Sequence, residues 1–367
     1  MFFLTVISQG LLYSCFALLM AYFISSLVPS DRKPNLFVPK AIRLMAAVGI
    51  ALFSFMPILQ LVLYLIQDYG LGQALQSVLL TFEVGKSWVY TFVMSIILSL
   101  FILLINDKKH KGYSLVGIGL VMMLIFGLGW SSHASSIDPV KGFVVHTLHF
   151  TAVSVWVGLV LVVGWFSQNT ANWIRFLKWF HVTAICCFIV TLLSGLLLMQ
   201  FVMDWQDYPD TWMVSYGQSL LLKHLLIIPL TGYAFMNGIL MKKKLKNAPE
   251  FDPRPWTKVE FVIILLIFTA TGALSQQSPP SNLASIIGLE GLSPLFTLFY
   301  EGPLNTDMSV ELVFGVNSLL LGILAILFFV LNIVSFMKKM PPLFSFLMVS
   351  FFMLSGYLAL LLSVRVV

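Results

Sequence analysis

Charged residues are scarce in this chain: Asp, Glu, Lys and Arg make up 10% of its 367 residues, whereas hydrophobic residues make up 59%. A soluble protein of ordinary composition has about a quarter of its residues charged. So few charges do not give enough polar surface to cover a water-soluble globule of this length. The scarcity therefore excludes a soluble catalytic or binding domain and indicates a membrane protein.

Cysteine is also scarce, and the motif of nucleotide-driven enzymes is missing. The three cysteines, Cys15, Cys186 and Cys187, all lie within apolar stretches, so no extracellular disulfide framework is expected. No segment matches G-x-x-x-x-G-K-[ST], and no polar stretch is long enough to form an ATPase domain. We therefore expect neither an enzyme nor an ATP-driven pump.

Long apolar runs fill most of the chain. A membrane-spanning helix needs about 20 predominantly apolar residues, because backbone polar groups must be satisfied internally in hydrocarbon. Ten stretches meet this requirement: 2–28, 38–67, 82–105, 113–130, 142–166, 176–203, 217–241, 257–276, 311–336 and 342–364. The sequence therefore predicts an all-α, polytopic transmembrane helical bundle of about ten spans, surrounded by lipid bilayer.

The chain has a net charge of +6, and its basic residues are unevenly distributed among the connections between these spans. Most of the 21 Lys and Arg residues fall in alternate connections, and those residues are Arg32, Lys33, Lys40, Arg43, Lys108, Lys109, Lys111, Arg175, Lys178, Lys242, Lys243, Lys244, Lys246, Arg254, Lys258, Lys338 and Lys339. The positive-inside rule then places these connections in the cytoplasm and both termini outside the cell membrane. The basic excess is a topology signal, so no nucleic-acid partner is expected.

Histidines near the predicted outer face carry the strongest chemical signal. His133 ends the fourth span, His146 and His149 open the fifth, and His224 lies about two turns into the seventh. The spacing of His146 and His149 separates their side chains by only about 60° around a helix. Ionisable groups in spans usually face a protein interior and mark a site or pathway. We therefore expect these four histidines to bind a metal or a cofactor.

Methionine sulfur accompanies the histidines. Met199 and Met203 lie four residues apart at the predicted outer end of the sixth span, facing the same way. Imidazole and thioether together form a soft ligand set that suits Cu(I). His181 lies 18 residues before Met199, which is five helical turns, so the two share a face about 27 Å apart. His181 and Met94, on the third span, are therefore candidate residues of a copper pathway.

The order of these residues resembles the CopD family of copper-resistance membrane proteins, which includes YcnJ-like copper transporters. The resemblance covers 113–280 and rests on the motifs Ser132-His133-Ala134, His146-x-x-His149, Trp156-x-Gly158, Arg175, Ser194-Gly195, Tyr216-Gly217, Leu222-Lys223, Asn237, Glu260 and Leu274 to Pro280. It implies copper handling at the outer face and copper import. His146 and Val157 depart from the Asp and Gly that often occupy these family positions.

The resemblance also implies a domain organisation. Residues 1–280 would form an eight-helix CopD-like membrane domain, 281–310 an extracytoplasmic loop, and 311–367 two additional transmembrane helices. No His- and Met-rich CopC-like domain is attached, so copper would arrive free or from a separate extracytoplasmic carrier protein.

Two alternatives stay open on the residues alone. Paired histidines on facing helices are also haem axial ligands, so His149 and His224 fit a b-type haem redox protein. An assembly factor that delivers copper to another protein without moving it across the membrane would need the same outer ligands. A haem Soret band would identify the first alternative, and activity without His181 would favour the second.

Overall fold

The computed structural model describes residues 1–104 and 111–367 and is almost entirely helical. Within these residues, 10 helical segments are long and apolar enough to cross a membrane. The predicted all-α, multi-spanning membrane fold is therefore confirmed, while the side on which the termini lie stays a prediction. The predicted cytoplasmic lysines Lys108 and Lys109 lie outside the described residues.

The chain forms two compact units, Met1–Phe201 and Val202–Val367. The helices of unit 1 are α1 (Phe2–Leu27), η1 (Ser30–Arg32), α2 (Lys40–Ser54), α3 (Met56–Leu80), α4 (Glu83–Leu104), α5 (Lys111–Trp130), α6 (His133–Ile137), α7 (Pro139–Phe166) and α8 (Trp173–Gln200). The predicted division at 280 and 310 stays a prediction.

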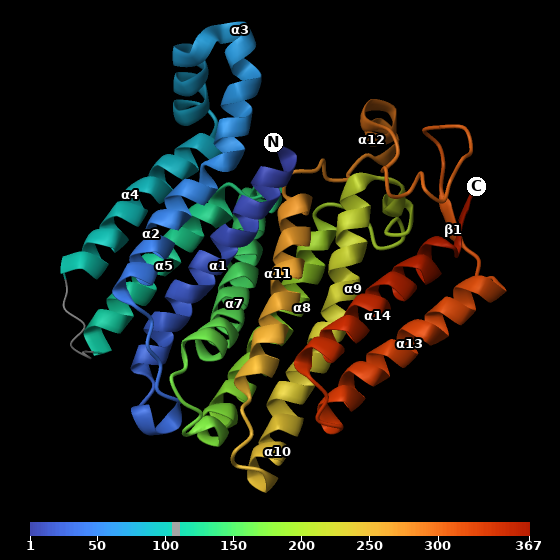
Figure 1. The fold of residues 1–367 in the computed structure, drawn as a ribbon. Coiled ribbons are helices and arrows are strands. Elements are labelled where there is room, and N and C mark those ends of the chain that lie inside the picture. The colour runs from blue at the N-terminus through green and yellow to red at the C-terminus, as the bar shows by residue number, and fades with distance from the viewer. Residues whose placement is uncertain (105–110) are drawn as a thin grey trace. The chain divides into compact units, whose positions relative to one another are not determined.

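The helices α1 and α7 pack against each other at the centre of unit 1 (Figure 1). Most of the length of α1 is buried, and Leu19, Ala21 and Phe23 are fully covered. The two helix backbones approach closely at Gly158, where an added Cβ atom would lie 2.0 Å from the carbonyl oxygen of Ala17. The apolar composition of both helices thus gives a tightly packed core that fixes α7, which carries His146 and His149.

The helix α3 reverses direction at Gly70, which adopts φ 73° and ψ 163° (Figure 1). Glycine tolerates this positive φ because it has no Cβ. The two arms pack through the buried residues Ile58 and Val62 on one side and Ala74 and Val78 on the other. The second span, predicted over 38–67, is therefore wrong at its end, because helix continues through this hairpin to Leu80.

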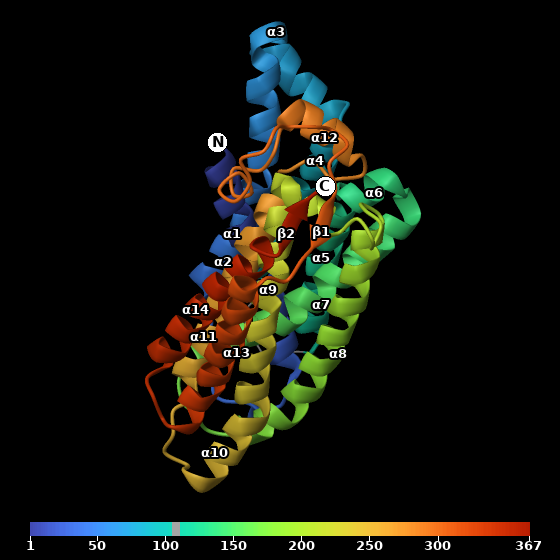
Figure 2. The same cartoon turned by 90° about the vertical axis from the view of Figure 1, so that its right-hand side faces the viewer.

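Unit 2 is built around α9 (Ser215–Phe235), with α11 (Arg254–Leu274) and α14 (Pro342–Leu361) packed on it (Figure 2). Its other elements are η2 (Asp210–Met213), the π-helical turn η3 (Met236–Leu240), α10 (Met241–Asn247), α12 (Leu283–Glu290), β1 (Val310–Leu312), α13 (Val316–Met337) and β2 (Val364–Val366). The strands β1 and β2 pair antiparallel, with Glu311 opposite Arg365.

Buried hydrogen bonds attach the last two spans to α9. The Tyr233 hydroxyl lies 2.6 Å from the Ser345 hydroxyl, and the Ser345 hydroxyl also contacts the side-chain oxygen of Asn332. Tyr233, Asn332 and Ser345 are fully buried. Polar contacts of this kind link helices inside membranes, where they contribute about 0.6 kcal/mol on average. The helices α13 and α14 are thus structural parts of unit 2.

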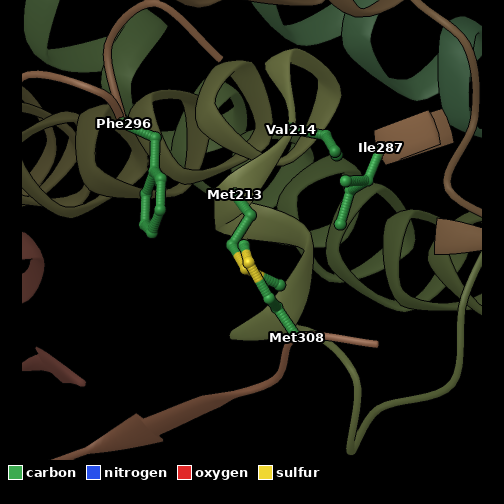
Figure 3. Packing of buried hydrophobic residues seen from close by; sticks show 5 residues of the cluster. All are labelled: Met213, Val214, Ile287, Phe296 and Met308. Atoms are coloured by element: carbon green, nitrogen blue, oxygen red, sulfur yellow. The ribbon is translucent and has the colours of Figure 1, made fainter. Parts of the chain in front are cut away.

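A small apolar core covers one end of unit 2 (Figure 3). Met213 and Val214 pack with Ile287 of α12 and with Phe296 and Met308 from the segment that leads to β1. The connection predicted as a loop over 281–310 therefore contains a helix and its own buried cluster. These side chains order the short η2 turn that immediately precedes α9.

Candidate metal centre

In unit 1, His149 of α7 is held by Ser194 of the neighbouring helix α8. The His149 Nδ1 and Ser194 Oγ atoms are 3.0 Å apart, and Ser194 is buried. The Ser194 hydroxyl also lies 2.5 Å from the carbonyl oxygen of Val190, which can only accept a hydrogen bond. The serine hydrogen is therefore used there, so Nδ1–H of His149 donates to Ser194 Oγ. In this tautomer a metal would be bound through His149 Nε2.

Gly195 provides the space beside the same ring. An added Cβ at Gly195 would lie 3.3 Å from His149 Cε1, tighter than an ordinary contact. Metal-binding histidines commonly have the second ring nitrogen oriented by such a hydrogen bond, which fixes the tautomer and the ring direction. The Ser194-Gly195 pair therefore orients His149 as a metal ligand requires.

His146 lies one turn before His149 and is half-buried. Its ring is nearly parallel to that of Phe150, with an interplanar angle of 10° and centroids 6.4 Å apart. Phe150 in turn packs edge-on against Tyr13 and Phe16 of α1. His146 is thus positioned by the aromatic core of unit 1.

His133 and Glu83 both line a cavity of about 440 Å³ in unit 1. The fourth span ends at Trp130, and His133 begins the separate short helix α6, so its predicted place at the end of that span is wrong. Ser132 caps α6 by accepting from the backbone N–H of Ser135. Glu83 forms an ion pair with Lys86, with 2.9 Å between their charged atoms.

In unit 2, His224 of α9 is held by Tyr208. The Tyr208 hydroxyl oxygen is 2.7 Å from His224 Nδ1, and the Tyr208 ring packs edge-on against Trp212. Burial raises the pKa of Tyr208 to about 12, so this phenol stays neutral at physiological pH. A metal on His224 Nε2 requires that Nδ1–H donate to the phenol oxygen, and the observed distance suits that bond.

The two methionines do not share a helical face. The helix α8 ends at Gln200, so Met199 lies in its last turn while Met203 follows in the coil that begins unit 2. The prediction that Met203 lies on the same helix as Met199 is therefore wrong, and the shared direction of the two side chains stays a prediction. Both side chains are buried.

Two further predicted residues, His181 and Met94, lie on helices of unit 1. His181 on α8 and Met94 on α4 are both half-buried. The three cysteines are free thiols. Among the described residues, no group of three or more His, Cys, Asp and Glu side chains is arranged to hold a metal ion. The outer site of four histidines stays a prediction, and His224 lies in a different unit from the other three.

Two functional contacts lie beyond what spacing could reveal. Tyr208 reaches His224 from 16 residues upstream, across a polar connection without periodicity. Asn237 and Glu260 are motif residues of the CopD resemblance, but their pairing between η3 and α11 becomes visible only in the fold. Both contacts join side chains through loop or helix packing rather than through a repeat in the sequence.

The fold is that of a multi-pass α-helical membrane protein, in which His149 and His224 each have one ring nitrogen within hydrogen-bond distance of a hydroxyl group. Residues 174–274 match the model of the CopD family, described as copper resistance protein D. The segment from α8 to α11 is therefore similar to this family of copper-resistance proteins. No match was found among curated proteins or among solved structures.

Acid sensitivity of unit 1 is expected to arise at Asp138, the N-cap of α7. Backbone N–H groups of Lys141 and Val140 donate to its carboxylate at 2.9 and 3.2 Å. These bonds, that from Lys141 most strongly, hold the pKa of Asp138 below its ordinary value. Because the pKa of Asp138 is lower in the folded protein than in the unfolded chain, where it is about 3.9, the ionised carboxylate stabilises the fold at pH values above about 3.9. This stabilisation is lost as the pH falls through the pKa of the folded protein.

We therefore expect Asp138→Asn to lower the thermal unfolding temperature at pH 7 and to have a smaller effect in acid. Asparagine keeps an acceptor for the cap but carries no charge. Unfolding temperatures of detergent-solubilised parent and variant, measured at neutral and acidic pH, test this. An equal difference at both pH values would show that the Asp138 charge does not contribute.

Proposed function

We propose that this protein is a copper transporter of the cell membrane that imports copper and catalyses no covalent reaction. The CopD match supports the copper-related role. The observation that carries the proposal is the hydrogen bond between His149 Nδ1 and Ser194, and Nε2 is the proposed coordinating atom. Tyr208 makes the equivalent contact with His224 in unit 2.

The proposed ligands are neutral imidazoles and thioethers, which favour Cu(I). In unit 1 they are His133, His146, His149 and Met199, and in unit 2 they are His224 and Met203. Neutral imidazole is required for coordination, so copper binding is expected to weaken as pH falls through about 6.5.

Inward movement follows from the proposed topology. With the basic connections in the cytoplasm and the termini outside, the membrane potential favours cation entry by about 2.3 kcal/mol per charge per 100 mV. His181 and Met94 would bind the copper ion transiently along its pathway through unit 1. Copper would reach the outer ligands free or from a separate extracytoplasmic carrier protein.

The first test is the copper content and absorption spectrum of the purified full-length protein beside a His133→Ala/His149→Ala double variant. We expect copper in the parent, its loss in the double variant, and no Soret band. Cys186→Ala is a matched control, because it removes an exposed soft ligand on α8 outside the proposed set. A Soret band that disappears in the double variant would replace the copper proposal with haem binding.

Flux separates transport from delivery. In proteoliposomes loaded with a copper-sensitive dye, we expect His181→Ala to slow copper uptake while copper binding at the outer ligands persists. If His181→Ala keeps the cellular copper delivery of the parent, and the parent itself shows no measurable uptake into proteoliposomes, an assembly factor is favoured over a transporter.

A further inference from the structure

A buried carboxyl group lies in unit 2, away from the histidines. Glu260, near the start of α11, is only 2% exposed, whereas every other glutamate in the chain is exposed. No Lys, Arg or His of the described residues forms an ion pair with it. An ionised carboxylate buried without a cation is costly, so such a group in a membrane span usually has a function.

Hydrogen-bond donors are too few around Glu260. The Asn237 side-chain Nδ2 donates to Glu260 Oε2 at 2.7 Å and to the backbone oxygen of Trp256 at 3.3 Å. A backbone carbonyl only accepts, which fixes the orientation of the amide. Asn237 Oδ1 is buried and has no hydrogen-bond partner within the described chain. One further hydrogen-bond donor would satisfy the acceptors of Glu260, Trp256 and Asn237, and the carboxyl group of Glu260 supplies such a donor when it is protonated.

The helix that carries Asn237 is locally altered. Residues Met236–Leu240 form the π-helical turn η3 between α9 and α10. Single π-helical turns inside helices are rare and occur frequently at functional sites. The turn places Asn237 opposite Glu260 at this level of the helix pair.

Few titratable groups face Glu260 from the helices packed against α11. On α9, Tyr233 lies one turn before Asn237 and its hydroxyl is engaged with Ser345. Lys223, the one lysine of α9, precedes Asn237 by 14 residues, about 21 Å along the helix, and His224 is next to it. The one titratable residue of α14 is Tyr357, which donates to Gln218 near the start of α9.

Basic residues of α10 and α11 lie at this end of unit 2, together with Lys338 and Lys339, which follow α13. On α11 itself, Arg254 pairs with Asp252 at 2.8 Å, and Lys258 lies two residues before Glu260. On α10, Lys244 lies over the rings of Phe251 and Phe336 and donates to the backbone oxygen of Phe336. The other α10 lysines are Lys242, Lys243 and Lys246.

We propose that Glu260 is a proton-binding site in unit 2, with Asn237 as its hydrogen-bonding partner. Glu260 accepts a proton to become a neutral carboxylic acid, and on releasing it becomes a carboxylate that accepts from Asn237 Nδ2. A membrane carboxyl that exchanges its proton is the group that proton relays in pumps and transporters use. This site does not depend on copper binding by the histidines.

Infrared spectroscopy of the full-length protein tests the proposal. At neutral pH, we expect the parent to show the carbonyl stretching band of a protonated carboxylic acid, which shifts in D₂O and is lost in Glu260→Gln. Glu301→Gln is the matched control, because it removes an exposed carboxyl outside the spans and should keep the band. Identical spectra for the parent and Glu260→Gln would overturn the proposal.

Isotope labelling keeps the test decisive if Glu260→Gln does not fold. In the unsubstituted protein, the band should shift when glutamate is labelled with ¹³C at the carboxyl carbon and stay in place when aspartate is labelled. Because Glu260 is the buried glutamate of the chain, a glutamate-dependent band that exchanges slowly with D₂O identifies it. A band that follows the aspartate label, or no band, would overturn the proposal.

Discussion

Replacing Gly158 with leucine is expected to prevent unit 1 from folding stably. Even a single Cβ at this position would lie 2.0 Å from the carbonyl oxygen of Ala17 and 2.8 Å from the Cβ of Ala21. The nearest obstacle is backbone of α1 rather than a flexible side chain, so the two helices must separate. Overpacking of a core costs about 1–3 kcal/mol, and a rigid backbone contact places this substitution at the upper end of that range or above it.

The matched control for Gly158→Leu is Gly119→Leu. Gly119 lies on the exposed surface of α5, and an added Cβ there would meet nothing within 4 Å. Thermal unfolding of detergent-solubilised protein, followed by loss of the monodisperse peak in gel filtration, compares the two. We expect Gly158→Leu to lower the midpoint by about 6–12 °C or to give no folded protein. Equal midpoints for both variants would show that α1 and α7 can move apart without cost.

The spans themselves could be predicted because one physical requirement governs them. Apolar runs of about 20 residues identify helices in hydrocarbon whatever their packing partners are. The helices α5 and α7, predicted over 113–130 and 142–166, occur at Lys111–Trp130 and Pro139–Phe166. The differences of two or three residues arise at caps, such as Asp138 before α7, that hydropathy does not register.

Helix ends and reversals inside apolar sequence could not be predicted in the same way. Nothing in the hydropathy of the second span marks the reversal at Gly70, which depends on one residue in the positive-φ region. The end of α8 at Gln200 likewise leaves Met203 outside the helical pattern on which its pairing with Met199 was predicted. Both errors come from extending a periodic pattern past a local change of backbone conformation.

The candidate site was predictable in its residue types but not in its supporting contacts. The histidines stand out because ionisable residues are rare in spans, and His149 is oriented by a residue of the Ser194-Gly195 motif. The partner of His224, in contrast, comes from the connection before α9, where Tyr208 has no periodicity to mark it. Contacts made by packing between helices require the fold, because sequence spacing relates only residues on one helix.

Loss of copper affinity in Ser194→Ala is the prediction that links this geometry to function. Alanine removes the acceptor that holds His149 Nδ1–H at 3.0 Å, so both the tautomer and the ring orientation are released. Removal of such an orienting partner typically weakens metal binding by about 10- to 100-fold. Competition with a Cu(I) chelator of known affinity, on purified protein under reducing conditions, measures the change.

A double-mutant cycle shows whether Ser194 acts through His149. His149→Ala should weaken copper binding at least as much as Ser194→Ala, and the double variant should bind no more weakly than His149→Ala alone, because the serine then has no imidazole to orient. The matched control is Ser154→Ala on α7, because the hydroxyl of this buried serine has no hydrogen-bond partner among the described residues and copper affinity should not change. Additive losses of affinity in the double variant would mean that Ser194 contributes to copper binding independently of His149. Full copper affinity in Ser194→Ala would remove His149 Nε2 from the proposed ligand set.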